Sequence, residues 1–196
     1  ENLVYNRMSD GLKAGIFRVG NLTGRYNDGY FQHNADENAF YNILRSFIKL
    51  GAVSKEIFKQ RVEFTPVDCC SRAIVRLLSI KNFTNRVFHV FNHNIIEFRD
   101  MLDMFNALGI NIKVMETEEF SQYIHRVALD DTKKKNIAGI VNNLSKKKML
   151  NFSASVNIDS RLTVNILKDL GFIWPEIDVV YIDKILKYMK SSGYLK

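Results

Sequence analysis

The feature that most constrains the fold is a strand-like apolar run that ends in a turn with two glycines. Residues 14–19 read Ala-Gly-Ile-Phe-Arg-Val, and residues 20–24 read Gly-Asn-Leu-Thr-Gly. Before this run, residues 1–10 carry apolar side chains at helical spacing, and Gly11 is typical of a helix end. A helix, a glycine turn and a strand in this order form the second half of a crossover unit, which predicts an α/β fold.

Helical and strand-like patterns alternate through the rest of the chain, with more helix than strand. The spacing of apolar residues predicts a helix after Asp68, in which Ala73, Ile74, Leu77 and Leu78 face inward. Asp68 itself is expected to be the N-cap of that helix. The other helices are expected over residues 34–50, 97–108, 116–143, 159–170 and 178–190. Short strands are expected over residues 62–64, 87–92 and 112–115.

The composition favours a globular chain from a reducing compartment. Hydrophobic residues make up 46% of the 196 residues, enough for a sizeable core in one domain or one domain with a small appendage. The two cysteines, Cys69 and Cys70, are neighbours, which makes them poor disulfide partners, so a cytoplasmic location is expected. No Cys/His cluster has metal-ligand spacing, and no apolar run is long enough to span a membrane.

The chain has a formal net charge of +7, and part of that charge is clustered. Lysine triplets occupy residues 133–135 and 146–148, on either side of a mostly uncharged stretch. A solvated helical face explains them as well as an acidic partner does. No helix-turn-helix pattern or interleaving of aromatic and basic residues is present, so nucleic-acid binding is not favoured. A basic module that binds another protein stays open as an alternative.

Two sequence patterns of dinucleotide-dependent reductases are absent from the chain. Gly20 and Gly24 do not form G-x-G-x-x-G, the turn whose backbone N–H groups hold a pyrophosphate. No Tyr-x-x-x-Lys occurs either, the spacing that places a tyrosine acid and a lysine on one helix face. The sequence therefore offers no catalytic residue.

Several segments nevertheless resemble one family, in the same order along the chain. The stretch 18–25, with the Asp28-Gly29 turn and Phe31-Gln32 after it, is similar to terminal thioester reductase domains of nonribosomal peptide and polyketide synthetases. These domains belong to the extended short-chain dehydrogenase/reductases. Further similar segments lie at residues 38–51, 63–77, 88–92 and 167–178.

The resemblance implies the fold, the reaction and the domain organisation. Family members use NADPH to reduce an acyl or peptidyl thioester on a phosphopantetheine carrier, and they release an aldehyde or an alcohol. Their catalytic helix with Tyr-x-x-x-Lys immediately precedes a segment like residues 1–4. Residues 1–26 are therefore expected to be a remnant of the Rossmann half, and residues 27–196 a mostly helical part facing substrate and carrier. Alone, the chain is expected to be inactive and to bind no cofactor.

The resemblance also implies roles for particular residues. The strand-end turn of Val19, Gly20 and Asn21 would lie beside the nicotinamide ring, where glycine permits close approach. The residues expected to line the substrate channel are Thr23, Tyr30, Phe31 and Gln32. Those expected to attract an acidic carrier domain are Arg126, Lys133, Lys134, Lys135, Lys146, Lys147 and Lys148.

Other residues are better explained by packing than by chemistry. His89 lies in an apolar strand and is expected to be a core histidine, and Trp174 is expected to anchor the last helix. Cys69 and Cys70 are expected to pack in the core. A fragment of a fatty-acyl-CoA reductase or of a nucleotide-sugar epimerase remains an alternative within the extended reductases.

Overall fold

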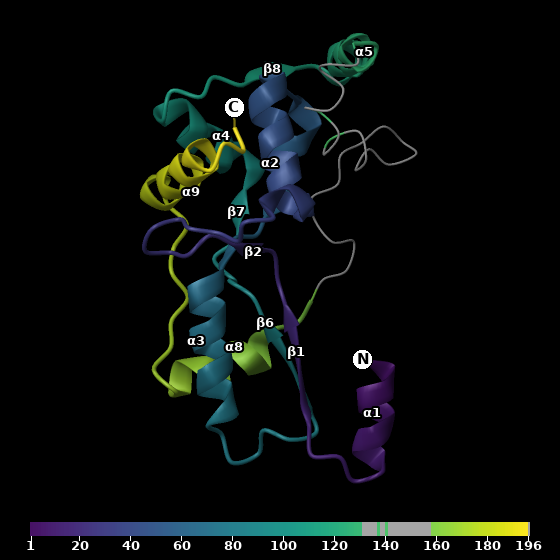
Figure 1. The fold of residues 1–196 in the computed structure, drawn as a ribbon, viewed down its shortest axis with the longest axis vertical. Helices are drawn as coiled ribbons and strands as arrows, with labels where there is room; N and C mark the ends of the chain where they lie inside the picture. Colours follow the sequence, from purple (N-terminus) through teal and green to yellow (C-terminus); the bar gives the residue numbers. More distant parts are fainter. Residues whose placement is uncertain (131–136, 138–139, 141–157, 196) are drawn as a thin grey trace. The chain divides into compact units, whose positions relative to one another are not determined.

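A computed structural model describes residues 1–130, 137, 140 and 158–195 (Figure 1). The contacts divide the chain into two compact units. Unit 1 contains Glu1–Tyr26, Glu63–Asn94 and the described residues of Val156–Glu176. Unit 2 contains Asn27–Val62 and the described residues of Ile95–Ser155 and Ile177–Lys196. The functional division between residues 26 and 27 stays a prediction, but residues 1–26 pack with two later segments rather than alone.

Unit 1 is built on two short pairs of parallel strands. The strand β1 (Gly15–Val19) pairs with β6 (Arg86–Val90), with Phe17 opposite Phe88. The strand β2 (Leu22–Thr23) pairs with β5 (Thr65–Pro66). The helix α1 (Asn2–Ser9) precedes β1 and buries none of its residues. Parallel pairing joined by helices confirms the predicted α/β class.

The core of unit 1 lies between these strands and two helices. The helices α3 (Val67–Leu78) and α8 (Arg161–Asp169) both contact β6 and each other. Rings of Phe17, Phe83 and Phe88 stack with centroids 5.5 to 6.0 Å apart. The buried side chains of this core are Cys69, Cys70, Ala73, Leu77, Phe88, Val90, Leu167, Phe172 and Trp174. The packing role of the two cysteines is thereby confirmed, and Trp174 is buried in the same core, while its role as an anchor of the last helix remains a prediction.

Unit 2 is mostly helical. Its helices are α2 (Ala39–Leu50), α4 (Phe98–Ala107), α5 (Thr117–Ala128) and α9 (Val179–Ser191), with 3₁₀ turns η1 (Ala35–Glu37) and η2 (Lys55–Lys59). The strands β3 (Ala52–Ser54) and β8 (Lys113–Met115) pair in parallel, and β4 (Arg61–Val62) pairs antiparallel with β7 (Ile96–Glu97). Its buried aromatic rings include Phe47 and Phe98, whose centroids lie 5.1 Å apart.

Three predicted element boundaries were wrong for local reasons. The helix predicted over residues 34–50 is divided, because the Asn38 side chain accepts the Tyr41 N–H at 3.0 Å and caps α2. The strand predicted over residues 62–64 stops at Val62. The helix predicted over residues 116–143 ends at Ala128, and Asp130 follows, an acidic residue that a helix C-terminus disfavours.

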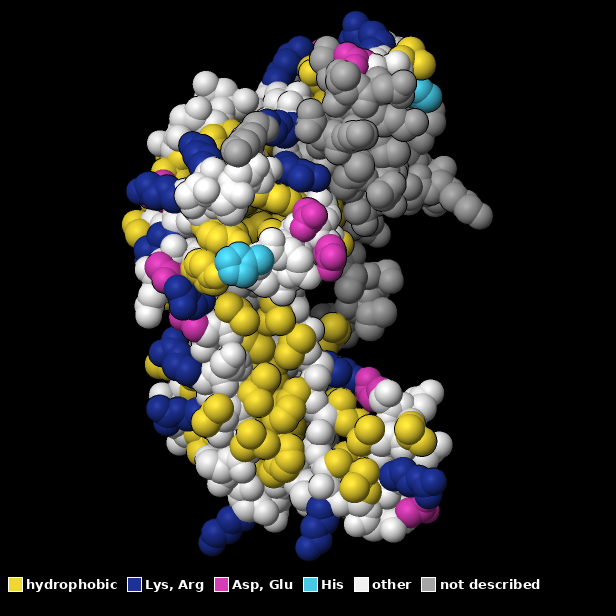
Figure 2. All heavy atoms as spheres, viewed as in Figure 1, with side chains coloured by type: hydrophobic (Ala, Val, Ile, Leu, Met, Phe, Trp, Pro, Cys, Tyr) yellow, Lys and Arg dark blue, Asp and Glu magenta, His cyan; other side chains and the backbone are white. Residues whose placement is uncertain are grey.

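The expected orientation of α3 needs two corrections. Pro66, and not Asp68, is the N-cap of this helix. Asp68 lies in the first turn, where its Oδ1 accepts the N–H groups of Tyr26 at 2.9 Å and Cys69 at 3.0 Å. Leu78 does not face inward, because it is 51% exposed. Val75 on the same helix is 66% exposed. Figure 2 shows hydrophobic side chains gathered on the visible surface over this helix.

Candidate functional site

The carboxyl ends of β1 and β6 form one edge of unit 1, and the predicted turn lies there. Val19 is the register partner of Val90, and the Gly20 N–H donates to the Val90 carbonyl at 3.3 Å. The Asn21 carbonyl accepts the Thr65 N–H at 3.0 Å. In open α/β sheets, ligands bind outside the carboxyl ends of the strands. The structure therefore brings Val19, Gly20 and Asn21 together at the edge where such a ligand would be expected.

A carboxyl group occupies the space next to Gly20. The Asn21 N–H points at both oxygens of Glu63, at 3.1 and 3.2 Å, and the Thr65 hydroxyl donates to Oε1 of the same side chain. A Cβ atom on Gly20 would lie 2.6 Å from Cδ of Glu63, closer than real Cβ contacts allow. The close approach at this glycine is thus made, in the structure, by Glu63.

A chain of hydrogen bonds extends from this carboxyl group through buried polar side chains. The Thr65 hydroxyl oxygen accepts the Asn92 N–H at 2.9 Å. Asn92 in turn accepts the Asn94 N–H at 3.0 Å and donates Nδ2–H to the Pro175 carbonyl at 3.0 Å. Thr65 and Asn92 are completely buried. Because buried polar groups are costly unless paired, the network fixes the edge of the sheet against the segment before α9.

Burial raises the pKa of ionisable groups at this edge. Burial raises the pKa of Glu63, and the hydrogen bonds from Thr65 and Asn21 offset part of that rise. Burial also raises the pKa of Cys70 to about 11, with the nearby Glu63 acting in the same direction. Burial raises the pKa of Cys69 as well. Since the thiolate is the reactive form, neither cysteine is an activated nucleophile.

The predicted substrate residues are divided between the two units. Thr23 lies in unit 1 and is completely buried. Tyr30, Phe31 and Gln32 lie in unit 2, where Phe31 is 3% exposed and stacks on Tyr41 with centroids 4.4 Å apart. Buried side chains can shape a channel wall but leave little surface for a ligand to touch. The substrate role of these residues remains a prediction.

Around Tyr30 the side chains form a small polar and aromatic cluster. The Tyr30 hydroxyl and His33 Nε2 lie 3.0 Å apart, and the Tyr30 ring contacts the Tyr188 ring edge-on at 5.5 Å. The Tyr188 hydroxyl donates to the Gln32 carbonyl at 3.0 Å, and burial raises the pKa of Tyr188. The loop before η1 is thus held on α9 with Tyr30 still 41% exposed.

Most of the predicted carrier-docking residues lie outside the described residues. This holds for Lys133–Lys135 and for Lys146–Lys148. Arg126 is described, in the last turn of α5, with its guanidinium carbon 6.0 Å from the centre of the Tyr123 ring. Their role in docking remains a prediction.

Sequence reasoning missed the polar network, although it placed some of its members. Thr65 directly follows one predicted strand and Asn92 is the last residue of another, which is the signal that could have pointed to them. His89, expected in the core, is only partly buried, and its N–H donates to Thr163 Oγ1 at 3.1 Å. Among the described residues, no three His, Cys, Asp or Glu side chains are grouped so that they could hold a metal ion. Nor does any helix in that part of the chain have the length and apolar character of a membrane span.

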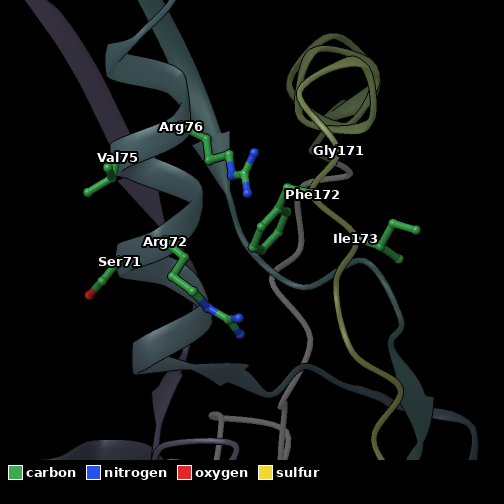
Figure 3. A pocket seen from close by; sticks show the side chains of 7 residues that line it. All are labelled: Ser71, Arg72, Val75, Arg76, Gly171, Phe172 and Ile173. Carbon is green, nitrogen blue, oxygen red and sulfur yellow. The ribbon is translucent and has the colours of Figure 1, made fainter.

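A shallow hollow beside α3 contains none of the predicted site residues. Its volume is about 410 Å³, and its lining residues are Ser71, Arg72, Val75, Arg76, Gly171, Phe172 and Ile173. Figure 3 shows Arg72 and Arg76 on the side of α3 that faces Phe172, and Arg76 donates to the Leu170 carbonyl at 2.6 Å. Because Arg76 already binds backbone and Ile173 is 82% exposed, the hollow is a weak candidate for a ligand site.

Comparisons with known proteins find similarity to nonribosomal peptide synthetases and to their reductase domains. No family model matches the chain. A linear gramicidin synthase of Brevibacillus parabrevis is 24% identical over 196 residues, which are 100% of this chain and 4% of that protein. A thiolation-reductase di-domain from an archaeal non-ribosomal peptide synthetase is 31% identical, with a TM-score of 0.80 over 100% of this chain and 39% of that one. The resemblance to terminal reductase domains is confirmed.

A second reductase structure has the same fold. The terminal R domain from the myxalamid PKS-NRPS biosynthetic pathway has a TM-score of 0.82 and 22% identity over 99% of this chain and 48% of that one. The chain thus has the fold of part of an extended reductase, and it spans less than half the length of these relatives. The UDP-glucuronic acid 4-epimerase of Bacillus cereus, solved with NAD, is more distant, at 12% identity and a TM-score of 0.58. The reductase resemblance is therefore favoured over the sugar-epimerase alternative.

Proposed function

We propose that the chain is the C-terminal, substrate-binding part of an NADPH-dependent reductase that releases carrier-bound acyl or peptidyl thioesters. The observation that carries the proposal is the 31% identity, over the whole chain, to a thiolation-reductase di-domain. The glycine loop and the catalytic tyrosine and lysine, whose patterns residues 1–196 lack, would be supplied by the Rossmann half that the resemblance implies.

The turn of Val19, Gly20 and Asn21 fits one edge of a nicotinamide ring. Val19 ends β1 with 46% of its apolar surface exposed, and the exposed Asn21 presents a carboxamide beside it. When bound, NADPH would supply a hydride to the thioester carbonyl carbon, and the pantetheine thiol would leave. The residues of this chain would orient the ring and the acyl group, while donors from the upstream half stabilise the oxyanion.

The substrate and carrier would be held by residues of unit 2. Tyr30, Phe31 and Gln32 would line the path of the acyl or pantetheine chain, and Thr23 of unit 1 would bind the substrate as well. Arg126 and the two lysine triplets would attract an acidic carrier domain, and electrostatic steering of this kind raises the association rate.

The test uses a polypeptide that also contains the residues preceding Glu1. We expect it to oxidise NADPH in the presence of a carrier-bound thioester and to release an aldehyde or an alcohol, detected by mass spectrometry. A polypeptide limited to residues 1–196 should show neither NADPH binding by calorimetry nor turnover. Tight NADPH binding by residues 1–196 alone would contradict the division of the site between the two halves.

Carrier docking is tested by reversing the charge of Lys133, Lys134 and Lys135 to glutamate. The Michaelis constant should rise several-fold for a carrier-bound thioester and stay unchanged for a short free thioester, because only the former carries the acidic domain. The control reverses three exposed lysines of unit 1, Lys13, Lys81 and Lys168, which changes net charge equally. Equal effects of the two triple variants, or equal effects on the two substrates, would refute the docking role.

A further inference from the structure

We propose that Glu63 is a positioning residue that fixes the turn of Val19, Gly20 and Asn21 through its carboxyl group. The proposal rests on the proposed function in one respect, that this turn borders the cofactor. Glu63 would act through the backbone of Asn21, whose N–H lies 3.1 and 3.2 Å from the two carboxyl oxygens.

Within the described part of the chain, the backbone of Gly20 and Asn21 is held by hydrogen bonds to three partners. One of these partners is a side chain. The Gly20 N–H binds the Val90 carbonyl, and the Asn21 carbonyl binds the Thr65 N–H. These two are backbone pairs that any side chain would preserve. The third joins the Asn21 N–H to Glu63, and only this bond can be removed by substitution. The orientation of the exposed Asn21 carboxamide therefore depends on residue 63.

The carboxyl group is held in place by its own partners. The Thr65 hydroxyl donates to Glu63 and accepts the Asn92 N–H at 2.9 Å, so its proton can point only toward the carboxyl group. Thr65 and Asn92 are fully buried, which restricts their movement. A positioned group supported by a second layer of fixed hydrogen bonds is the arrangement that gives precise orientation.

The carboxyl group of Glu63 occupies the space that a side chain at residue 20 would need. The three atoms nearest to a Cβ built on Gly20 are Oε1, Cδ and Oε2 of Glu63, all closer than 3.0 Å. A side chain at residue 20 would displace the carboxyl group before it met anything else. The missing side chain at Gly20 is thus accounted for by the space that the carboxyl group of Glu63 occupies.

The experiment compares E63A, E63Q, G20A and the double variant E63A/G20A in the polypeptide that includes the residues preceding Glu1. The NADPH Michaelis constant should rise about tenfold in E63A, the effect of losing one hydrogen bond to the buried carboxyl group. E63Q should stay within about threefold, because the glutamine oxygen can accept from Asn21 and Thr65. The kcat at saturating NADPH should change less than the Michaelis constant. Glu118→Ala, which removes an exposed glutamate of α5, is the control.

The double variant separates two explanations of Gly20. If the glycine makes room for the carboxyl group, G20A raises the Michaelis constant in the wild-type background and adds less than about threefold in E63A. If the ring itself packs on Gly20, the two effects multiply, and the proposal is overturned. If E63A does not fold, G20A alone still tests the proposal. An unchanged NADPH Michaelis constant in G20A would overturn it.

Amide hydrogen exchange of the peptide 17–26 tests the positioning role without any substrate. Exchange of the Asn21 amide should be at least tenfold faster in E63A and G20A, and unchanged in E63Q and in the Glu118 control. Unchanged exchange in E63A would overturn the positioning role. Absence of NADPH-dependent thioester reduction by the wild-type protein would instead refute the proposed function, and the exchange measurement would still decide the role of Glu63.

Discussion

Gly29 is a described position at which a single added methyl group should be especially costly. It is buried, with φ of 73°, in the loop that leads to Tyr30. A Cβ built on it would lie 2.8 Å from the backbone nitrogen of Ile185, and the carbonyl group of Lys184 is closer still. Both belong to α9 within unit 2. Backbone atoms of a helix cannot rotate away, so the loop and α9 would have to separate.

Gly51 provides a matched comparison for the size of this effect. It ends α2 with φ of 64°, and nothing lies within 4 Å of a Cβ built there. Gly51→Ala should therefore cost only the left-handed strain, about 1–2 kcal/mol. Gly29→Ala should cost that strain plus about 1–3 kcal/mol for forcing packed elements apart. We expect the free energy of unfolding to fall by about 2–5 kcal/mol in Gly29→Ala.

Urea denaturation followed by circular dichroism measures both losses in the same protein. The midpoint of Gly29→Ala should lie clearly below that of Gly51→Ala, with similar slopes in urea for the two variants. Below its transition, Gly29→Ala should also show a raised Michaelis constant for the thioester, because the loop of Tyr30 rests on α9. Equal loss of stability in the two alanine variants would refute the argument from contact with the helix backbone.

Three further outcomes test the polar edge of unit 1. Asn92→Ala should lower the unfolding free energy by about 2–4 kcal/mol in urea titrations, because it leaves buried partners without hydrogen bonds; an alanine at the exposed His93 should have little effect. Because the pKa of Glu63 is raised in the fold, stability from its protonated form is present below the ordinary pKa of 4.5 and lost as pH rises through the raised value. E63Q should thus gain stability relative to wild type on going from pH 4.5 to pH 8, a window in which Cys70, with a pKa of about 11, does not titrate; a constant difference would contradict this. Cys69 and Cys70 should react with iodoacetamide only after unfolding, and rapid native alkylation measured by mass spectrometry would show that the thiols are not protected.

Local sequence signals predicted the order of elements well where the signal lay within a few residues. The apolar run at residues 14–19 became β1, one residue shorter than predicted. Gly51, Gly109 and Gly171 follow the ends of helices and all have positive φ, as helix-ending glycines do. Asp178 caps α9, with its carboxylate accepting the Tyr181 N–H at 2.8 Å. These helix ends depend on the few residues around them, so sequence alone could locate them.

Other errors arose where a partner distant in the sequence decides the conformation. Asp68 looked like a helix cap, but its carboxylate is also used by Tyr26, 42 residues earlier. Glu63 looked like part of a strand, and it instead turns its carboxyl group toward Asn21, which lies 42 residues before it. Spacing patterns along a chain carry no information about such pairs, because the pairing depends on which strands become neighbours.

The same reasoning changes what the glycine turn implies for function. Gly20 showed from the sequence that some group must come close, and the structure shows that this group is a carboxyl from the protein itself. The side chains that remain exposed at the end of β1 are those on either side, Val19 and Asn21. A ring bound at this edge would therefore contact residues 19 and 21 while Gly20 supports them from behind. Substitutions at residue 19 should then alter cofactor binding without altering stability, whereas substitutions at residue 20 should alter both.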